Sequence, residues 1–297
     1  MQRRTLRLLF VTQIVSGIGI AIGASVGALL AADIAGISVS GLAQSANVVG
    51  AALFAVPATA LVYRHGRRPS LAAGYFVAVA GSLVVVAAAV RGSIPLLFAG
   101  LFLFGGATAA TLQARYAAVD LAPAALAGRH LSLIVWGTTL GAVVGPSLAP
   151  PAGASLAGFG IPPLAGPFFF SALLFGLSTS LLLLFLRPDP AVIARGAAGI
   201  TRTPSSDAPG PGMRAALRVV ASRPSARLGV SAMAIGHVVM IGVMAMTPVH
   251  IRGAGHDAAH TLRIVGLVLS FHIAGMFAMS PVFGWLTDRL GRRPVVL

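Results

Sequence analysis

The chain has 297 residues, of which 57% are hydrophobic and 9% are charged, and its mean hydropathy is +0.93. A soluble domain carries about a quarter charged residues, so this composition excludes that class and indicates a membrane protein. The net charge of +15 comes from 21 arginines and six aspartates, and the lack of cysteine excludes disulfides and thiolate metal sites.

Eight apolar runs are long enough to cross a bilayer as helices, which takes about 20 residues each. They are expected near 7–31, 39–62, 70–90, 94–117, 130–150, 165–186, 227–250 and 262–286. The sequence therefore predicts an all-α polytopic membrane protein whose first partner is the lipid bilayer.

The arginines fall mostly in alternate connections between these runs. If the N-terminus is cytoplasmic, the outside connections hold only Arg91, Arg252 and Arg263. Positive residues concentrate on the cytoplasmic side of membrane proteins. We therefore expect both termini in the cytoplasm of a cell-membrane protein. The same pattern explains the basic charge without a nucleic-acid partner.

Two amides, Gln44 and Asn47, lie three residues apart in the second run and so share a helix face. Polar amides in a membrane bundle serve as hydrogen-bonding links between helices, or they line a cavity that holds a substrate. Both interpretations stay open for this pair.

The fourth run carries Thr108, Thr111 and Arg115 on one face. An ionisable residue at membrane depth suggests function. Arg115 is near the inner end of the run, however, where its side chain can reach the membrane surface. It is a substrate or proton candidate, or a structural arginine near Asp120.

Glycines recur every fourth residue in the fifth run, at Gly137, Gly141 and Gly145, and Pro146 follows. Such a stripe lets another helix approach closely. Pro146 is expected to bend or weaken the helix at its outer half.

Residues 187–226 separate the sixth and seventh runs. The middle, 201–212, is rich in proline, glycine and serine, as linkers are. After it, Arg214 and Arg218 share one face of 213–222 and Leu217 and Val220 another, which predicts a short amphipathic helix on the inner membrane surface.

One histidine lies near the middle of each of the last two runs, His237 and His272, on faces that also hold methionines. A neutral histidine bonded to a carbonyl is the simpler interpretation. The sharper one makes His237 or His272 the acceptor of a coupling proton, because histidine changes charge near neutral pH.

A short pattern occurs twice. Arg64, Gly66, Arg67 and Arg68 recur in the same order as a later set at a constant spacing along the chain. The later set is Arg289, Gly291, Arg292 and Arg293, and it is preceded by Gly284 and Asp288. Each glycine is expected to end a helix in left-handed geometry. Two copies of one connection suggest two related halves of a membrane protein.

Asp288 lies in the last turn of its helix, where the C-terminus already carries partial negative charge. A carboxylate there needs hydrogen-bond donors. Arg289 and Arg292 could supply them, or the positive N-terminus of another helix.

The segment 284–293 resembles the signature between the second and third, and the eighth and ninth, helices of the major facilitator superfamily of transporters. The copy at 64–68 is weaker, with Tyr63 where the later copy has Asp288. The glycine stripe is similar to the fifth-helix signature of the proton-driven exporters in that superfamily, although Ala149 and Pro150 depart from it. A generic close-packed helix is the alternative for this stripe.

The resemblance implies that the end of the eighth helix lies beside the start of the fifth, around residues 129–131. Asp288 would then latch the cytoplasmic side closed. It also implies a family length of twelve helices, so we expect a chain truncated after the eighth.

The sequence thus predicts a six-helix half at 1–186, a cytoplasmic linker at 187–226 and the first two helices of a second half at 227–297. The expected function is secondary transport by alternating access, in the form of proton-coupled export of a small amphipathic molecule. Proton-coupled uptake, facilitated diffusion and a truncated, non-transporting protein are the alternatives. The sequence shows no catalytic or phosphate-binding motif, so we expect neither an enzyme nor a cofactor.

Overall fold

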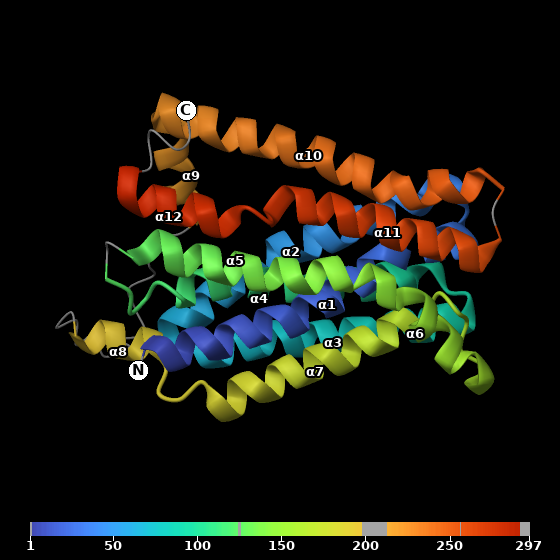
Figure 1. The fold of residues 1–297 in the computed structure, drawn as a ribbon, viewed down its shortest axis with the longest axis horizontal. Helices are drawn as coiled ribbons and strands as arrows, with labels where there is room; N and C mark the ends of the chain where they lie inside the picture. The colour runs from blue at the N-terminus through green and yellow to red at the C-terminus, as the bar shows by residue number, and fades with distance from the viewer. Residues whose placement is uncertain (1, 124–125, 198–212, 256, 292–297) are drawn as a thin grey trace.

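The structure is a computed structural model, and it describes residues 2–123, 126–197, 213–255 and 257–291. Within these ranges every regular element is helical, and the long helices run along a common axis (Figure 1). The all-α prediction is therefore confirmed.

Twelve α-helices make up the described part of the chain. They are α1 (Gln2–Ala35), α2 (Ile37–His65), α3 (Arg67–Arg91), α4 (Ile94–Ala117), α5 (Ala127–Val144), α6 (Ala149–Leu156), α7 (Gly166–Phe185), α8 (Pro190–Ala197), α9 (Met213–Ser222), α10 (Pro224–Gly253), α11 (Ala258–Phe277) and α12 (Ser280–Leu290). The short helix expected near 213–222 is α9, whereas the linker 201–212 lies outside the described residues.

Eight helical segments among the described residues are long and apolar enough to cross a membrane, which agrees with the eight predicted runs.

The bend expected at Pro146 is present, because α5 ends at Val144 and a 3-10 turn, Pro146–Leu148, leads into α6. The last predicted run is also one membrane-length segment, Ala259–Leu290. Within it a short turn separates α11 from α12, because Pro281 has no N–H to donate to the carbonyl of Phe277.

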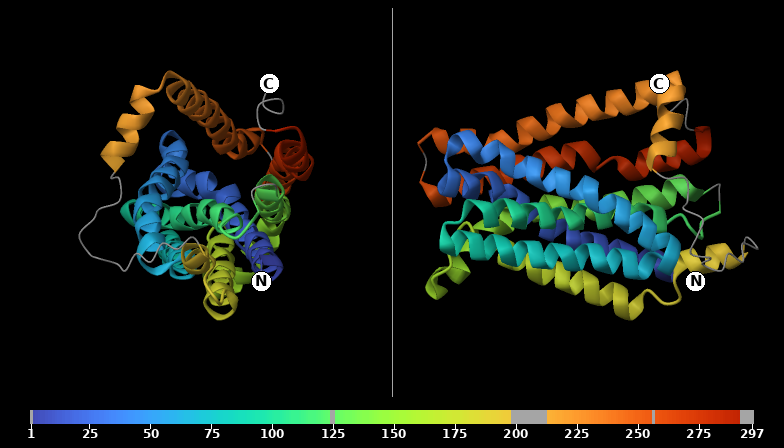
Figure 2. Two further views of the ribbon diagram at one scale, coloured as in Figure 1. Left: turned by 90° about the vertical axis from the view of Figure 1, so that its left-hand side faces the viewer. Right: turned by 180° about the vertical axis from the view of Figure 1, so that it is seen from behind.

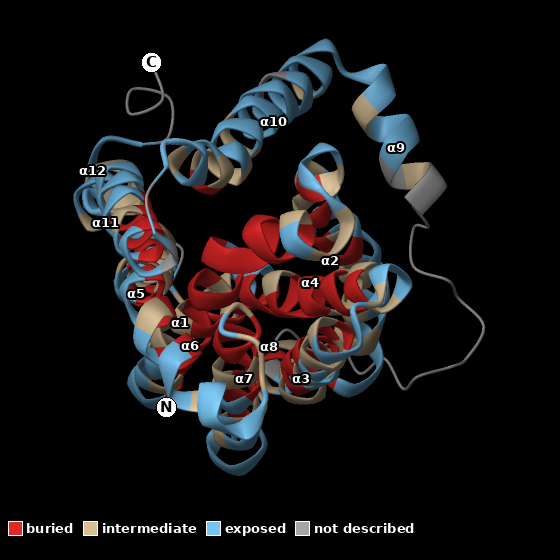
Figure 3. Cartoon of the chain, turned by 90° about the vertical axis from the view of Figure 1, so that its right-hand side faces the viewer, coloured by how far each residue is buried: buried red, intermediate tan, exposed pale blue. Residues whose placement is uncertain are grey.

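The core of the molecule lies around α1 and α4 (Figure 3). In the most apolar stretch of α1, 72% of the residues are buried, whereas none are in the corresponding stretch of α10. The helices α10, α11 and α12 lie along one side of the bundle, and much of α10 stands clear of it (Figure 2). The first six spans therefore form the compact part, and α5 provides the main contact for α11 and α12.

Aromatic side chains fill the centre of this compact part. Phe104 of α4 packs edge-on against Phe168 and Phe175 of α7, with ring centroids 5.6 and 5.4 Å apart. Gly19 and Gly23 of α1 leave room for these rings, because a β-carbon there would come within 2.8 Å of Phe175 and Phe104. The fold thus fixes α1 against α4 and α7 through small residues facing large ones.

Candidate functional site

The two copies of the repeated pattern have the same backbone geometry. Gly66 has φ 99° and ψ −178°, and Gly291 has φ 87° and ψ 168°. Both N–H groups donate to the carbonyl four residues earlier, at 3.0 and 3.1 Å. Positive φ was expected, but with ψ near 180° these residues lie in an extended region that is almost restricted to glycine. Only glycine therefore fits at either position.

Both connections lie at the same end of the bundle. Gln2, at the start of α1, donates to the carbonyl of Ala118 after α4. Arg67, at the start of α3, pairs with Asp120 in that same connection, and Asp288 reaches the start of α5. Arg292 and Arg293 lie outside the described residues.

Asp288 accepts hydrogen bonds from the N-terminus of α5. Its Oδ1 lies 2.9 Å from the N–H nitrogen of Gly128, and its Oδ2 lies 2.7 Å from that of Arg129. The first N–H groups of a helix have no partner within the helix and carry partial positive charge. They supply the donors that the carboxylate lacks at the end of its own helix.

Two glycines allow this close approach. A β-carbon at Gly128 would lie 2.5 Å from Oδ1 of Asp288, and one at Gly284 would overlap the hydroxyl of Ser132. The sequence signature requires glycine at 284 for this reason, because α12 and α5 cross there almost backbone to backbone. Within the described part of the chain Arg289 forms no hydrogen bond or ion pair with Asp288, and its guanidinium carbon lies 5.2 Å from the centre of the Trp285 ring.

The arginines of the first copy bind within the protein. Arg67 forms two hydrogen bonds with Asp120, at 2.8 and 3.0 Å, and a third with Gln113, whose amide donates to Thr59. Arg68 donates twice to the carbonyl of Leu183. Asp120 is therefore the partner of Arg67 rather than of Arg115.

Sequence reasoning missed Asp189, which joins two helix N-termini. Its Oδ2 accepts from the N–H of Arg68 at 2.7 Å, and its Oδ1 accepts from that of Ala191 at 2.9 Å. The available signal is Asp189-Pro190, because aspartate before proline is typical of a helix start. Where the later copy has Asp288, the first has Tyr63, which is exposed and contributes only its carbonyl, to Arg195.

The glycine stripe of α5 faces α1. A β-carbon at Gly141 would overlap the carbonyl oxygen of Ile14, and one at Gly145 would lie 2.9 Å from that of Ile18. Both neighbours are backbone atoms. The stripe therefore brings two helices of the compact part together, as the packing interpretation requires. A β-carbon at Gly137 would lie 2.9 Å from the ring of Phe10 on α1.

A buried polar cluster beside this stripe was also missed. Gln13 of α1 donates to the hydroxyl of Tyr75 on α3 and accepts from Thr138 on α5, at 3.1 and 2.9 Å. Tyr75 also bonds to Ser16 and to Thr111 of α4. Thr111 of the predicted polar face therefore belongs to a network that links four helices.

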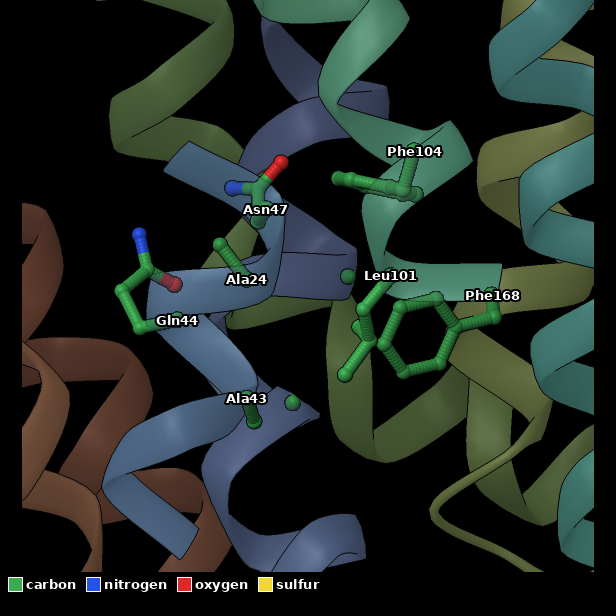
Figure 4. Close-up of a pocket in the computed structure, with 9 residues that line it drawn as sticks. Ala24, Ala43, Gln44, Asn47, Leu101, Phe104 and Phe168 are labelled. Atoms are coloured by element: carbon green, nitrogen blue, oxygen red, sulfur yellow. The ribbon is translucent and has the colours of Figure 1, made fainter. Parts of the chain in front are cut away.

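Gln44 and Asn47 line a recess among α1, α2, α4 and α7 (Figure 4). The two amides come from α2, and Leu101, Phe104 and Phe168 lie opposite them. Its volume of about 10 Å³ is at the lower limit of what a single water molecule needs. Asn47 is 8% exposed, and its Oδ1 has no hydrogen-bond partner in the described part of the chain.

The other predicted residues do not come together. His237 and His272 are both exposed, on α10 and α11. Arg115 is partly buried, and its Nε has no partner among the described residues. Arg64 is exposed at the end of α2. The structure thus places Asp288 at the N-terminus of α5 and brings Gln44 and Asn47 into one recess. The two histidines lie away from both sites.

A bundle of eight membrane-length helical segments among the described residues defines a polytopic helical membrane protein. The chain belongs to the Major Facilitator Superfamily, whose model matches residues 9–297. Two relatives from Bacillus subtilis (strain 168) cover 99% of the chain. They are the uncharacterized MFS-type transporters YdeG, 40% identical, and YddS, 36% identical.

The match extends over 67% of YdeG and 66% of YddS, so the chain spans about two thirds of the length of these relatives. The riboflavin transporter RfnT of Brucella anthropi is 26% identical over 99% of the chain and 69% of its own length. An auto-inhibited POT family peptide transporter of known structure matches 97% of the chain and 54% of its own, with 16% identity and a TM-score of 0.48. The family prediction is confirmed, and the relatives' names agree with a transporter rather than an enzyme.

Proposed function

We propose that the chain is a secondary transporter that works by alternating access and exports a small amphipathic molecule in exchange for protons. Both termini would face the cytoplasm, at the end of the bundle that holds the two repeated connections. The observation that carries the proposal is the pair of hydrogen bonds from the N-terminus of α5 to Asp288. They join a helix of the first six spans to the last described one.

This contact acts as a latch between two halves, residues 1–186 and 227–297. While Asp288 holds the N-terminus of α5, the two helix ends cannot separate and the cytoplasmic side stays closed. At the opposite end, Arg252 of α10 pairs with Asp33 of α1. Both contacts are formed in the structure, so under this proposal one of them must break for the transporter to open to either side of the membrane.

The driving force is adequate for export. One proton moving down 100 mV supplies about 2.3 kcal/mol. A free energy of about 1.4 kcal/mol corresponds to a tenfold ratio, so one proton sustains a gradient of roughly 40-fold for a neutral substrate. His237 and His272 are the proposed proton acceptors, because histidine is the side-chain type best suited to take up and release a proton under physiological conditions.

Riboflavin is a suitable first probe, since the relative RfnT is named a riboflavin transporter, and ethidium serves as a second, amphipathic probe. Cells that express the chain should accumulate less probe than cells without it, and a protonophore should remove the difference. Greater accumulation favours uptake instead. Equal accumulation of both probes contradicts transport by this chain and favours the non-transporting alternative.

The same assay tests the histidines. The double variant His237→Gln/His272→Gln is expected to export at a rate that no longer changes between about pH 5 and pH 8. The matched control is His65→Gln/His250→Gln, which removes two histidines near the helix ends and should keep the pH dependence. An unchanged pH dependence in the first variant removes His237 and His272 from the mechanism.

Gln44 and Asn47 are the proposed polar contacts for the substrate. Their recess has a volume of only about 10 Å³, so a substrate would enter it only after α2 moves away from α1 or α4. The unpartnered Oδ1 of Asn47 would accept a hydrogen bond from the substrate. A small molecule with one N–H or O–H donor and an aromatic or apolar body fits between the amides and the two phenylalanines.

The variant Asn47→Leu distinguishes a role in substrate binding from a role as a hydrogen-bonding link between helices. If Asn47 lines the substrate site, Asn47→Leu should raise the KM for export about tenfold, with the melting temperature unchanged or raised. Removing a buried polar group that has no partner costs little stability. A lower melting temperature with an unchanged KM contradicts the substrate role.

A further inference from the structure

Two arginines flank a hollow where α1 begins and α7 ends. The hollow has a volume of about 370 Å³ and is lined by Arg4, Thr5, Phe185, Arg187 and Pro188. It shares no lining residue with the recess at Asn47. We propose that it binds the phosphate group of an anionic phospholipid at the inner membrane surface.

The positive charges of the hollow are not neutralised within the described part of the chain. Among the described residues, the arginine–aspartate ion pairs join Arg67 to Asp120 and Arg252 to Asp33. The nearest acid along the chain, Asp189, already accepts from the backbone of Arg68 and Ala191. Arg4 and Arg187 are therefore free to bind an anion.

The residue types match a phosphate ester. Guanidinium groups bind phosphate oxygens through paired N–H donors. Thr5 is 7% exposed and adds a hydroxyl to the lining. Basic pockets between membrane helices on the cytoplasmic side are suited to anionic lipid headgroups.

The apolar surroundings favour a lipid over soluble phosphate. Phe185, in the lining, is 50% exposed, and Leu184 beside it is 63% exposed at the end of a membrane-length helix. A phosphate held by Arg4 and Arg187 would place acyl chains along this surface of α7. Free phosphate would use the arginines and leave Phe185 and Leu184 unoccupied.

Native mass spectrometry of the purified chain in a neutral detergent tests the proposal. Phosphatidylglycerol and phosphatidylcholine with identical acyl chains are added in turn. The chain should bind phosphatidylglycerol at least tenfold more than phosphatidylcholine. The double variant Arg4→Gln/Arg187→Gln should lose most of this preference. The control Arg91→Gln/Arg263→Gln, with the same charge change at exposed arginines elsewhere, should keep it.

A third arm adds inorganic phosphate at millimolar concentration to the phosphatidylglycerol complex. Retention of the lipid supports a headgroup site. Displacement supports the same phosphate chemistry with a soluble source. Equal binding of the two lipids, or an equal loss in the control, overturns the proposal. If the double variant does not fold, the single variants Arg4→Gln and Arg187→Gln replace it. Each should lose the preference for phosphatidylglycerol several-fold.

Discussion

The variant Asp288→Asn is expected to move the population towards the state open to the cytoplasm by roughly 30-fold. Hydrogen bonds to charged groups contribute about 1 kcal/mol more than neutral ones, and Asp288 accepts two of them from α5. Asparagine keeps one acceptor oxygen and turns its NH₂ group towards an N–H donor. A combined loss of about 2 kcal/mol from the two hydrogen bonds corresponds to the expected shift of roughly 30-fold in the population.

Distances between spin labels measure this shift directly, because the chain has no native cysteine to interfere. Labels at His65→Cys and Leu290→Cys, both exposed positions, report on the ends of α2 and α12 that we propose face the cytoplasm. The Asp288→Asn variant should gain a longer distance between them. An unchanged distribution would show that Asp288 does not act as a latch.

The matched control is Asp33→Asn at the opposite end. It removes the ion pair with Arg252, whose side chain is 48% exposed. Exposed pairs contribute only about 0.2–1 kcal/mol, so the shift should be smaller. It should also have the opposite direction, and it should lengthen the distance between labels at Ile37→Cys and Gly253→Cys. A shift in the same direction as Asp288→Asn contradicts two opposed contacts.

The sequence predicted the membrane-length helices well, because the length of an apolar run can be read from each segment without knowing what the segment packs against. It also anticipated a partner for Asp288, since a carboxylate at a helix C-terminus needs outside donors. The bonds reach Gly128 and Arg129, slightly earlier than expected. The short turn before α12 has no counterpart in the predicted runs, because Pro281 lies inside a stretch that is apolar throughout.

The sequence could not identify the hydrogen-bond partners of the polar residues that lie within apolar runs. Gln13 and Tyr75 are isolated in the sequence, and only the packing of α1 against α3 and α5 brings them together. Asp189 lies beyond the last apolar residues of its run and binds a helix start far earlier in the chain. His237 and His272 were expected at a similar depth in the membrane, on helix faces that also hold methionines. A similar depth does not decide which face of a helix points into the bundle, and both histidines are exposed.

The second large effect is expected at Gly141. In Gly141→Ala the new β-carbon would overlap the carbonyl of Ile14 and lie 2.7 Å from the nitrogen of Ile18. Both are backbone atoms and cannot rotate away, so α5 must move off α1. Overpacking of this kind costs about 1–3 kcal/mol. The hydrogen bond from Thr138 to Gln13, one turn earlier, would weaken as well.

We therefore expect Gly141→Ala to lower the melting temperature in detergent by several degrees, whereas Gly176→Ala, in open space on α7, should leave it almost unchanged. The variant should also lengthen the distance between the cytoplasmic labels, because α5 carries the N–H groups that hold Asp288. A lower melting temperature with an unchanged distance would mean that the stripe serves packing alone. Both changes together would mean that the contact of α5 with α1 sets the position of the latch.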